Sequence, residues 1–176
     1  FGIDVRVPDM LTAVVIRPPV LRGKVVKLDG KKALASPGVK HVIEIPHGVG
    51  VVADTYWHAR KGAELVDVEF DNGSMAEFST AKLRDTHLAL LKTEAKSVTD
   101  VGSIDDGLKL ATAQLQSVYE VPFLAHATME PMNATAPVEE TRCRVWVPTQ
   151  APTIVKDVAS RMTGLPFDKI DVVTTF

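Results

Sequence analysis

The stretch "VVADTYWHARKGAELVDVEFDNG", from Val51 to Gly73, contains a complete strand–helix–strand pattern. The apolar residues before Asp54 are typical of a buried strand, and Asp54 or Thr55 can cap the helix that follows. Residues 66–73 then alternate between apolar and polar side chains and end in an Asp-Asn-Gly turn signal. The stretch therefore predicts a short helix between two strands.

The residues on the N-terminal side of this stretch predict several short strands separated by prolines and glycines. One or two helical turns are expected at residues 29–39. Because helices are mixed among mainly antiparallel-looking strands, without a regular βαβ repeat, the sequence predicts an α+β fold. The expected strands are residues 3–8, 10–19, 23–29, 40–46 and 48–54.

The composition becomes more polar after Gly73, and one helix is expected there, near residues 81–91. We therefore predict three regions. They are a first domain over residues 1–72, a linker over residues 73–102, and a second domain over residues 103–176.

The second predicted domain begins with Ser103 and Asp106, whose spacing is that of a weak capping box. The helix at residues 153–162 is amphipathic, and Gly164 is expected to end it. Its inward face is predicted to consist of Ile154, Val155, Val158, Ala159 and Met162. The other predicted elements are a strand at 115–123, an irregular segment at 125–136, a hairpin of 135–140 with 143–150, and a last strand at 168–176.

The bulk composition is that of an ordinary globular protein, with 45% hydrophobic and 24% charged residues. The net charge of −2 gives no electrostatic case for binding nucleic acid or an anionic membrane. No apolar run approaches the length of a transmembrane helix. The single cysteine, Cys143, excludes an internal disulfide and a multi-cysteine metal site, and its strand-like surroundings favour a buried, inert thiol.

His126 and Glu130 have the spacing of a metal-binding or acid–base pair on a helix. Pro131 argues against that helix, because the residue before a proline is pushed away from the α conformation. A third ligand is also missing nearby, so we predict no metal site and instead a buried polar pair that holds an irregular loop. A small hydrolase that uses both residues stays open as an alternative, although the sequence offers it no nucleophile.

Thr149 and Gln150 lie where the strand in "VWVPTQAP" gives way to a helix. The end of a strand that leads into a helix is a common place to present a side chain to a ligand. Glutamine carries both a donor and an acceptor, so it can hydrogen-bond an oxo group or a substrate heteroatom. A simple turn or capping role is the alternative.

The sequence resembles the molybdopterin-binding large subunit of the xanthine dehydrogenase/aldehyde oxidase superfamily. The resemblance is to the branch of the isoquinoline 1-oxidoreductase beta subunit, whose members are often labelled aldehyde dehydrogenases. It covers nearly the whole chain and is weakly marked only over residues 74–115. The stretches that carry it include Phe1–Pro19, Leu34–Pro46, Val51–Gly73, "YEVPFLAHATMEPMNATA" (Tyr119–Ala136) and "VWVPTQAP" (Val145–Pro152).

The resemblance implies that residues 1–72 form an α/β-hammerhead domain and that the remainder is the first part of a molybdenum cofactor-binding domain. It also implies that Gln150, with Thr149 beside it, lies at the cofactor, where Gln150 hydrogen-bonds the apical oxo ligand of the molybdenum. Glu130 matches the Met-Glu-Pro position of the family and is not its catalytic base. We further expect His126, Glu130 and Asn133 to support the segment that presents Gln150.

The activity implied by the resemblance is oxidation of an aldehyde or an N-heteroaromatic substrate, with water as the oxygen source. The implied cofactor is molybdopterin, in the cytosine dinucleotide form, and the implied partner is a [2Fe-2S] small subunit that removes the electrons. The alternative from another functional class is a noncatalytic hammerhead module for binding or assembly.

The chain begins without methionine and ends on a strand at Phe176, before the family's glycine-rich loop and its distal catalytic glutamate. We therefore expect an internal fragment that is inactive alone and binds no cofactor by itself. Because any signal segment would lie outside this stretch, the location stays open between the bacterial cytoplasm and the periplasm.

Overall fold

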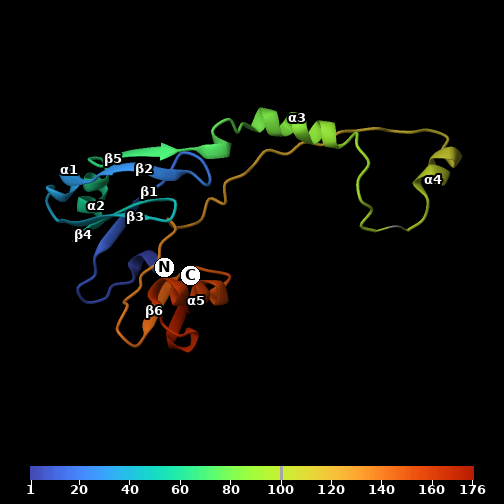
Figure 1. Ribbon diagram of the computed structural model, residues 1–176. Helices are drawn as coiled ribbons and strands as arrows, with labels where there is room; N and C mark the ends of the chain where they lie inside the picture. The colour runs from blue at the N-terminus through green and yellow to red at the C-terminus, as the bar shows by residue number, and fades with distance from the viewer. Residues whose placement is uncertain (100) are drawn as a thin grey trace. The chain divides into compact units, whose positions relative to one another are not determined.

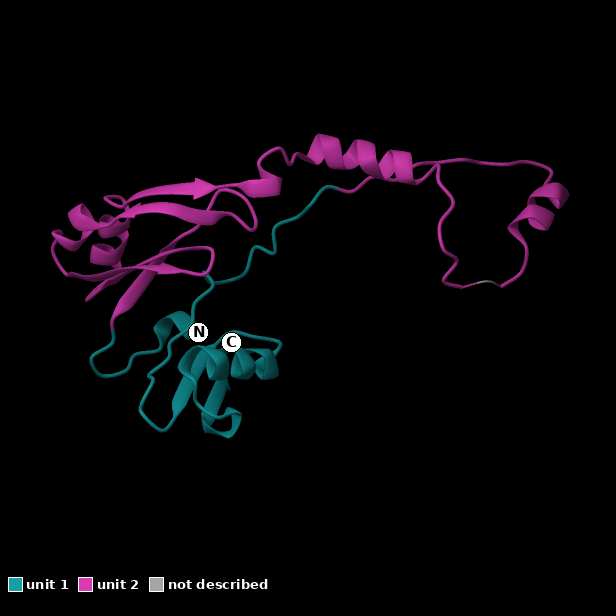
Figure 2. Cartoon of the chain, viewed as in Figure 1, with its two compact units in different colours: residues 1–10, 122–176 teal, residues 11–121 magenta. Residues whose placement is uncertain are grey.

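A computed structural model describes residues 1–99 and 101–176, and it divides the chain into two compact units (Figure 2). One unit is Leu11–Val121, and the other combines Phe1–Met10 with Pro122–Phe176. These bounds differ from the predicted regions, because the first ten residues pack with the C-terminal part of the chain rather than with the strands that follow them.

The unit Leu11–Val121 contains a three-stranded antiparallel sheet in the order β1-β4-β3 (Figure 1). Its strands are β1 (Thr12–Ile16), β3 (Val39–Ile45) and β4 (Gly48–Ala53). The central strand β4 is almost wholly buried, which explains its nearly continuous run of apolar residues. A separate antiparallel pair joins β2 (Lys24–Asp29) to β5 (Asp67–Asp71). The corresponding predicted strands are confirmed.

The helix α2 (Tyr56–Ala63) covers the sheet through its smallest residues. Ala59 and Gly62 are buried, and Ala59 forms a core cluster with Val39, Val51 and other sheet residues. The Thr55 hydroxyl accepts a hydrogen bond from the backbone amide of His58, which confirms Thr55 as one of the two predicted caps. The short helix α1 (Lys31–Leu34) lies beside α2.

The remainder of this unit contains the 3₁₀ turn η2 (Gly73–Met75) and the helices α3 (Thr80–Leu90) and α4 (Ile104–Leu110). Ser79 and Ser103 cap α3 and α4, as Thr55 caps α2. The strand predicted at residues 115–123 is absent, and these residues are exposed and form no ladder in the described chain. An apolar, β-branched sequence becomes a strand only beside a partner strand, so this prediction was wrong.

The other unit is built around a βαβ element of β6 (Cys143–Val147), α5 (Pro152–Thr163) and β7 (Ile170–Thr174). The two strands are parallel, with Cys143 paired to Ile170 and Val147 to Thr174. The expectation that the chain has no βαβ pattern is therefore incomplete, since this one unit is present within a mixture of helix and sheet. Two 3₁₀ turns, η1 (Gly2–Asp4) and η3 (Phe167–Lys169), complete it.

Two local predictions in this unit are corrected. The strand expected at residues 3–8 is replaced by η1 and a loop. The predicted hairpin is reduced to two isolated bridges, Thr135 with Trp146 and Val138 with Cys143, while β6 pairs mainly with β7. In both cases the neighbour, rather than the local pattern, determines the pairing.

The core of the βαβ element consists of Cys143, Val145 and Ile170, covered by Val155 and Ala159 of α5. The predicted inward face of α5 was too wide, because Ile154, Val158 and Met162 are exposed by 64%, 44% and 71%. The helix ends at Gly164, whose φ of 75° requires the left-handed conformation, as predicted. Cys143 is buried, as predicted, and this burial raises the pKa of its thiol.

Within residues 1–99 and 101–176, the helices are all too short or too polar to cross a membrane.

Candidate functional site

The candidate site lies at the carboxyl ends of β6 and β7. Pro148, Thr149 and Gln150 follow β6 directly, and Thr175 follows β7. In a parallel sheet the carboxyl ends of the strands meet at one edge, and this is the edge at which α/β proteins usually bind ligands. The backbone amide of Thr175 donates to the carbonyl of Val147 at 3.2 Å, so the pairing continues up to this edge.

Thr149 and Gln150 form the turn between β6 and α5. The Thr149 Oγ1 accepts a hydrogen bond from the backbone amide of Ala151 at 3.0 Å. Its own hydroxyl hydrogen therefore remains able to donate to a ligand. Gln150 is exposed, so its amide donor and carbonyl acceptor face solvent. The turn presents two uncharged hydrogen-bonding side chains at the sheet edge.

A group of polar side chains surrounds Gly2 at the same edge. A β-carbon on Gly2 would lie 2.5 Å from Asn133 Oδ1, 2.9 Å from Thr175 Oγ1 and 3.1 Å from Pro148 Cδ. Asn133 Oδ1 and Thr175 Oγ1 are buried and have no hydrogen-bond partner among the described residues. Buried polar atoms of this kind are usually satisfied, so two of them side by side indicate an incomplete polar network.

Asn133, which was predicted from the sequence, is thus brought to the β6–β7 edge. Gly2 and Thr175 lie there too and were missed. The signal that could have indicated Thr175 is its position directly after an apolar strand, which is also the position of Thr149 and Gln150 after β6. Nothing local in the sequence indicates Gly2, because its neighbours come from residues more than a hundred positions away.

Glu130 fastens the N-terminal residues to this unit. Its carboxylate accepts hydrogen bonds from the backbone amides of Gly2 at 3.2 Å and Ile3 at 3.0 Å. The hydrogen bond from Ile3 is the largest cause that lowers the pKa of Glu130, with smaller contributions from Gly2 and Asn133. A carboxylate held ionised in this way is a poor proton shuttle at neutral pH and a good capping group.

His126 is not brought to Glu130. It is exposed, and none of the hydrogen bonds of the described residues joins the two side chains. The predicted buried pair is therefore wrong, because the backbone amides of η1 occupy the carboxylate instead. No group of three His, Cys, Asp or Glu side chains with metal-binding geometry occurs in residues 1–99 and 101–176.

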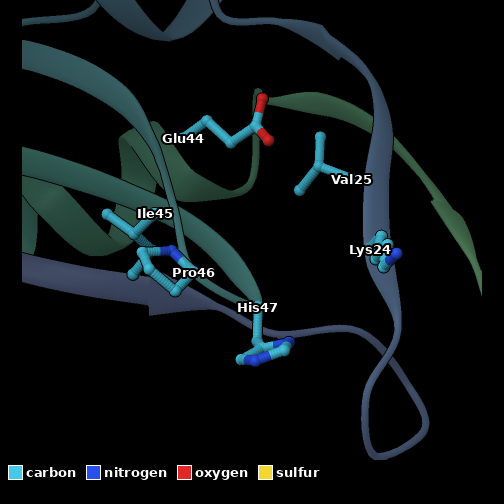
Figure 3. A pocket seen from close by; sticks show the side chains of 6 residues that line it. All are labelled: Lys24, Val25, Glu44, Ile45, Pro46 and His47. Carbon is cyan, nitrogen blue, oxygen red and sulfur yellow. The ribbon is translucent and has the colours of Figure 1, made fainter.

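Two surface hollows lie elsewhere on the chain. The first, of about 490 Å³, belongs to the unit Leu11–Val121 and is open to solvent (Figure 3). It offers only Lys24, Glu44 and His47 as polar side chains, on different strands and loops, which is no recognisable catalytic set. The second, of about 360 Å³, lies in the other unit. Its lining residues are Val7, Pro8, Pro137, Glu139, Arg142, Arg144 and Trp146.

Comparison with known proteins finds a family that matches the C-terminal half of the chain and relatives that match most of its length. A family described as the molybdopterin cofactor-binding domain matches residues 88–176. The chain is 28% identical to the beta subunit of isoquinoline 1-oxidoreductase from Brevundimonas diminuta, over 97% of this chain and 23% of that protein. It is 29% identical to a nicotinate dehydrogenase subunit of Pseudomonas putida, over 87% of this chain and 14% of that protein. The chain thus spans less than a quarter of the length of these relatives.

Solved structures support the same fold. The quinoline 2-oxidoreductase of Pseudomonas putida 86 matches with a TM-score of 0.70 and 17% identity, over 99% of this chain and 28% of that one. The aldehyde oxidoreductase of Desulfovibrio gigas matches with a TM-score of 0.65 and 17% identity, over 94% of this chain and 23% of that one. At this identity the likeness concerns the fold alone.

The family match, over half of the chain, and the curated relatives confirm the resemblance stated above. This chain belongs to the molybdopterin cofactor-binding domain family, in the group of the molybdenum subunits of the xanthine dehydrogenase/aldehyde oxidase superfamily.

Proposed function

We propose that this chain is part of a molybdenum-dependent oxidoreductase that oxidises aldehydes or N-heteroaromatic compounds with water as the oxygen source. The support is the family match over residues 88–176, together with relatives named for isoquinoline, nicotinate, xanthine and aldehyde substrates. The single observation that carries the proposal within the chain is the β6–β7 edge, where Thr149 and Gln150 follow β6 and the unsatisfied buried oxygen of Thr175 follows β7.

The side chains of this edge fit a molybdenum cofactor as hydrogen-bonding groups and not as metal ligands. Gln150 and the Thr149 hydroxyl are uncharged donors, suited to an oxo group and to the polar edge of a pterin. The bound cofactor would supply the redox chemistry and the activated oxygen. Gln150 would orient the oxo group, Thr149 would hold the turn and donate its remaining hydrogen, and Asn133 would keep the supporting segment in place.

Glu130 has a structural role in this proposal. Because two backbone amides already occupy its carboxylate, it holds η1 against the segment that carries Asn133. That contact keeps Gly2 at the edge, where any larger residue would displace Asn133 and Thr175. His126, which is exposed, is left without a role at the edge.

The proposed complete enzyme includes a [2Fe-2S] partner subunit that accepts the electrons, and the proposed cofactor is the cytosine dinucleotide form of molybdopterin. We propose that the 176 residues alone neither retain the cofactor nor turn over substrate. Stoichiometric molybdenum in the purified 176-residue chain, measured by inductively coupled plasma mass spectrometry, would contradict this part of the proposal.

The test of the site is Gln150→Ala in a longer protein that contains this chain, reconstituted with its partner subunit. The expected result is full molybdenum content with kcat/KM lowered about 100-fold, the effect of removing one well-placed hydrogen-bond donor from an active site. Gln116→Ala is the matched control, because Gln116 is exposed and outside helices and strands. Unchanged activity of Gln150→Ala at full molybdenum content would remove Gln150 from the mechanism.

The noncatalytic alternative is an assembly module that uses the Leu11–Val121 unit to dock a partner. Binding of the partner by this unit alone, together with turnover that is unaffected by substitutions at the β6–β7 edge, would favour it. The observation on its side is the unit's own hydrophobic core, which does not depend on the βαβ element.

A further inference from the structure

The helix α2 exposes two aromatic side chains away from its buried residues: the helical spacing puts Trp57 on the face opposite Ala59 and Gly62, and Tyr56 at the flank of that face. Ala59 and Gly62 are buried against the sheet, whereas Tyr56 and Trp57 are 60% and 62% exposed. Tyrosine and tryptophan are among the residues most enriched at the energetic centres of protein interfaces. Ala59 and Gly62 already pack this short helix against the sheet, so packing within the unit does not account for the two exposed aromatic side chains.

The aromatic pair is combined with positive charge. The Lys61 ammonium lies 5.0 Å from the centre of the Trp57 ring, a cation–π contact that also orients the ring. Arg60 and Lys61 both reach Glu64, at 3.4 and 3.1 Å, and the Lys61 hydrogen bond is the largest cause that lowers the pKa of that carboxyl. These contacts order both cations without burying them.

The helix α1, which is in contact with α2, adds exposed positive charge. It contributes Lys31 and Lys32, which are exposed, and Leu34, which is 48% exposed. Neither α1 nor α2 contains an acidic residue. We call the set Lys31, Lys32, Tyr56, Trp57, Arg60 and Lys61 the α1–α2 face.

The start of α2 is held rigidly. The His58 Nδ1 and the Asp54 carboxylate are 2.6 Å apart, and Thr55 caps the helix. Gly38 lies so close to both side chains that a β-carbon there would collide with them. A face whose backbone is fixed in this way loses little conformational entropy when a partner binds.

We propose that the α1–α2 face docks an acidic segment of a partner protein. Carboxylates of the partner would pair with Lys31, Lys32, Arg60 and Lys61, and an apolar side chain of the partner would cover the ring of Trp57. Glu64 offsets part of the charge of Arg60 and Lys61, and the face with Lys31 and Lys32 stays positive. This charge favours a carboxylate-rich partner, since like-charged surfaces are repelled. This inference does not depend on the molybdenum chemistry, because none of its residues belongs to the β6–β7 edge.

The experiment uses a fluorescein-labelled copolymer of glutamate and tyrosine in a 4:1 ratio as the probe, titrated with the protein and followed by fluorescence anisotropy. Trp57→Ala and Lys61→Glu are each expected to weaken binding about five-fold or more, the effect typical of a residue at the energetic centre of an interface. Trp57→Phe should restore binding. Lys96→Glu is the charge control, because Lys96 is exposed and lies outside α1 and α2.

Three results would overturn the proposal. One is equal weakening by Lys61→Glu and Lys96→Glu, which would show a response to net charge alone. A second is equally tight binding of duplex DNA or of phosphatidylglycerol vesicles through the same residues. The third is protection of Trp57 from acrylamide quenching in a longer protein without its partners, which would place the face inside that protein. Thermal unfolding of each variant, followed by circular dichroism, shows whether a variant that binds weakly is still folded.

Discussion

The Glu130 carboxylate and the backbone amide of Ile3 are 3.0 Å apart although 127 positions separate the two residues. The contact caps the 3₁₀ turn η1, whose first amides have no partner within the turn itself. It explains why a carboxylate stands in the Met-Glu-Pro sequence without a metal or a catalytic partner beside it. The residue that looked like half of an acid–base pair is a long-range capping group.

The first prediction follows from this contact. Glu130→Gln removes the charge that the two amides favour, so it should lower the melting temperature of the unit formed by residues 1–10 and 122–176. The pKa of Glu130 lies below its ordinary value of 4.5 in the folded chain. The stabilisation is therefore complete above about pH 4.5 and disappears as the pH falls through the lowered pKa.

Thermal unfolding followed by circular dichroism from pH 7 to pH 3 measures this effect. The melting temperatures of the original protein and Glu130→Gln should differ at pH 7 and converge at low pH. Glu140→Gln is the matched control, because Glu140 is exposed and accepts none of the hydrogen bonds found in the described chain. A difference in melting temperature that stays constant across this pH range would mean that the charge of Glu130 does not contribute to stability.

The second prediction concerns the crowded position at Gly2. Gly2→Ala should destabilise the protein by about 1–3 kcal/mol, the usual cost of overpacking, because its β-carbon would meet Asn133 and Thr175. Gly107→Ala is the control. Nothing lies within 4 Å of a β-carbon at Gly107, which is in α4, so alanine should be neutral or stabilising there. Urea unfolding measures both, and equal effects would disprove the crowding at Gly2.

The sequence was informative wherever the relevant contact was local. Thr55 and Ser103 cap helices as predicted, and Gly164 ends α5, because caps depend on residues within one turn. The strands of the three-stranded sheet were also predictable, since alternation and apolar runs record burial directly. Such signals need no knowledge of the distant chain.

The errors arose where the partner is distant or missing. Residues 115–123 have a strand-like composition but no neighbouring strand in the described chain, so they lie outside helices and strands and are exposed. The capping of η1 by Glu130 and the position of Thr175 beside Asn133 depend on residues far away in the sequence. A site built from such contacts cannot be read from local spacing. The local pattern therefore indicates Gln150 as a candidate and does not single out Gly2 or Thr175.

The third prediction tests the N-terminal cap of α2. Thr55→Ala should cost about 1 kcal/mol, because the amide of His58 loses its only acceptor in the described chain. Thr55→Ser keeps the hydroxyl and should recover most of the loss. Urea unfolding of both variants checks the cap, and an equal loss in the serine variant would indicate that the Thr55 methyl group matters instead of the hydrogen bond.

The fourth prediction separates the two faces of the βαβ element. Ile170 is fully buried in its core, so Ile170→Ala should cost about 2–5 kcal/mol. Ile154 was expected to face inward, but it is 64% exposed, so Ile154→Ala should change stability by no more than about 0.5 kcal/mol. Both substitutions remove the same atoms. The difference between their unfolding free energies, measured by urea titration, therefore reports the difference in burial. A comparable loss at Ile154 would restore the wider inner face that the sequence pattern of α5 predicts.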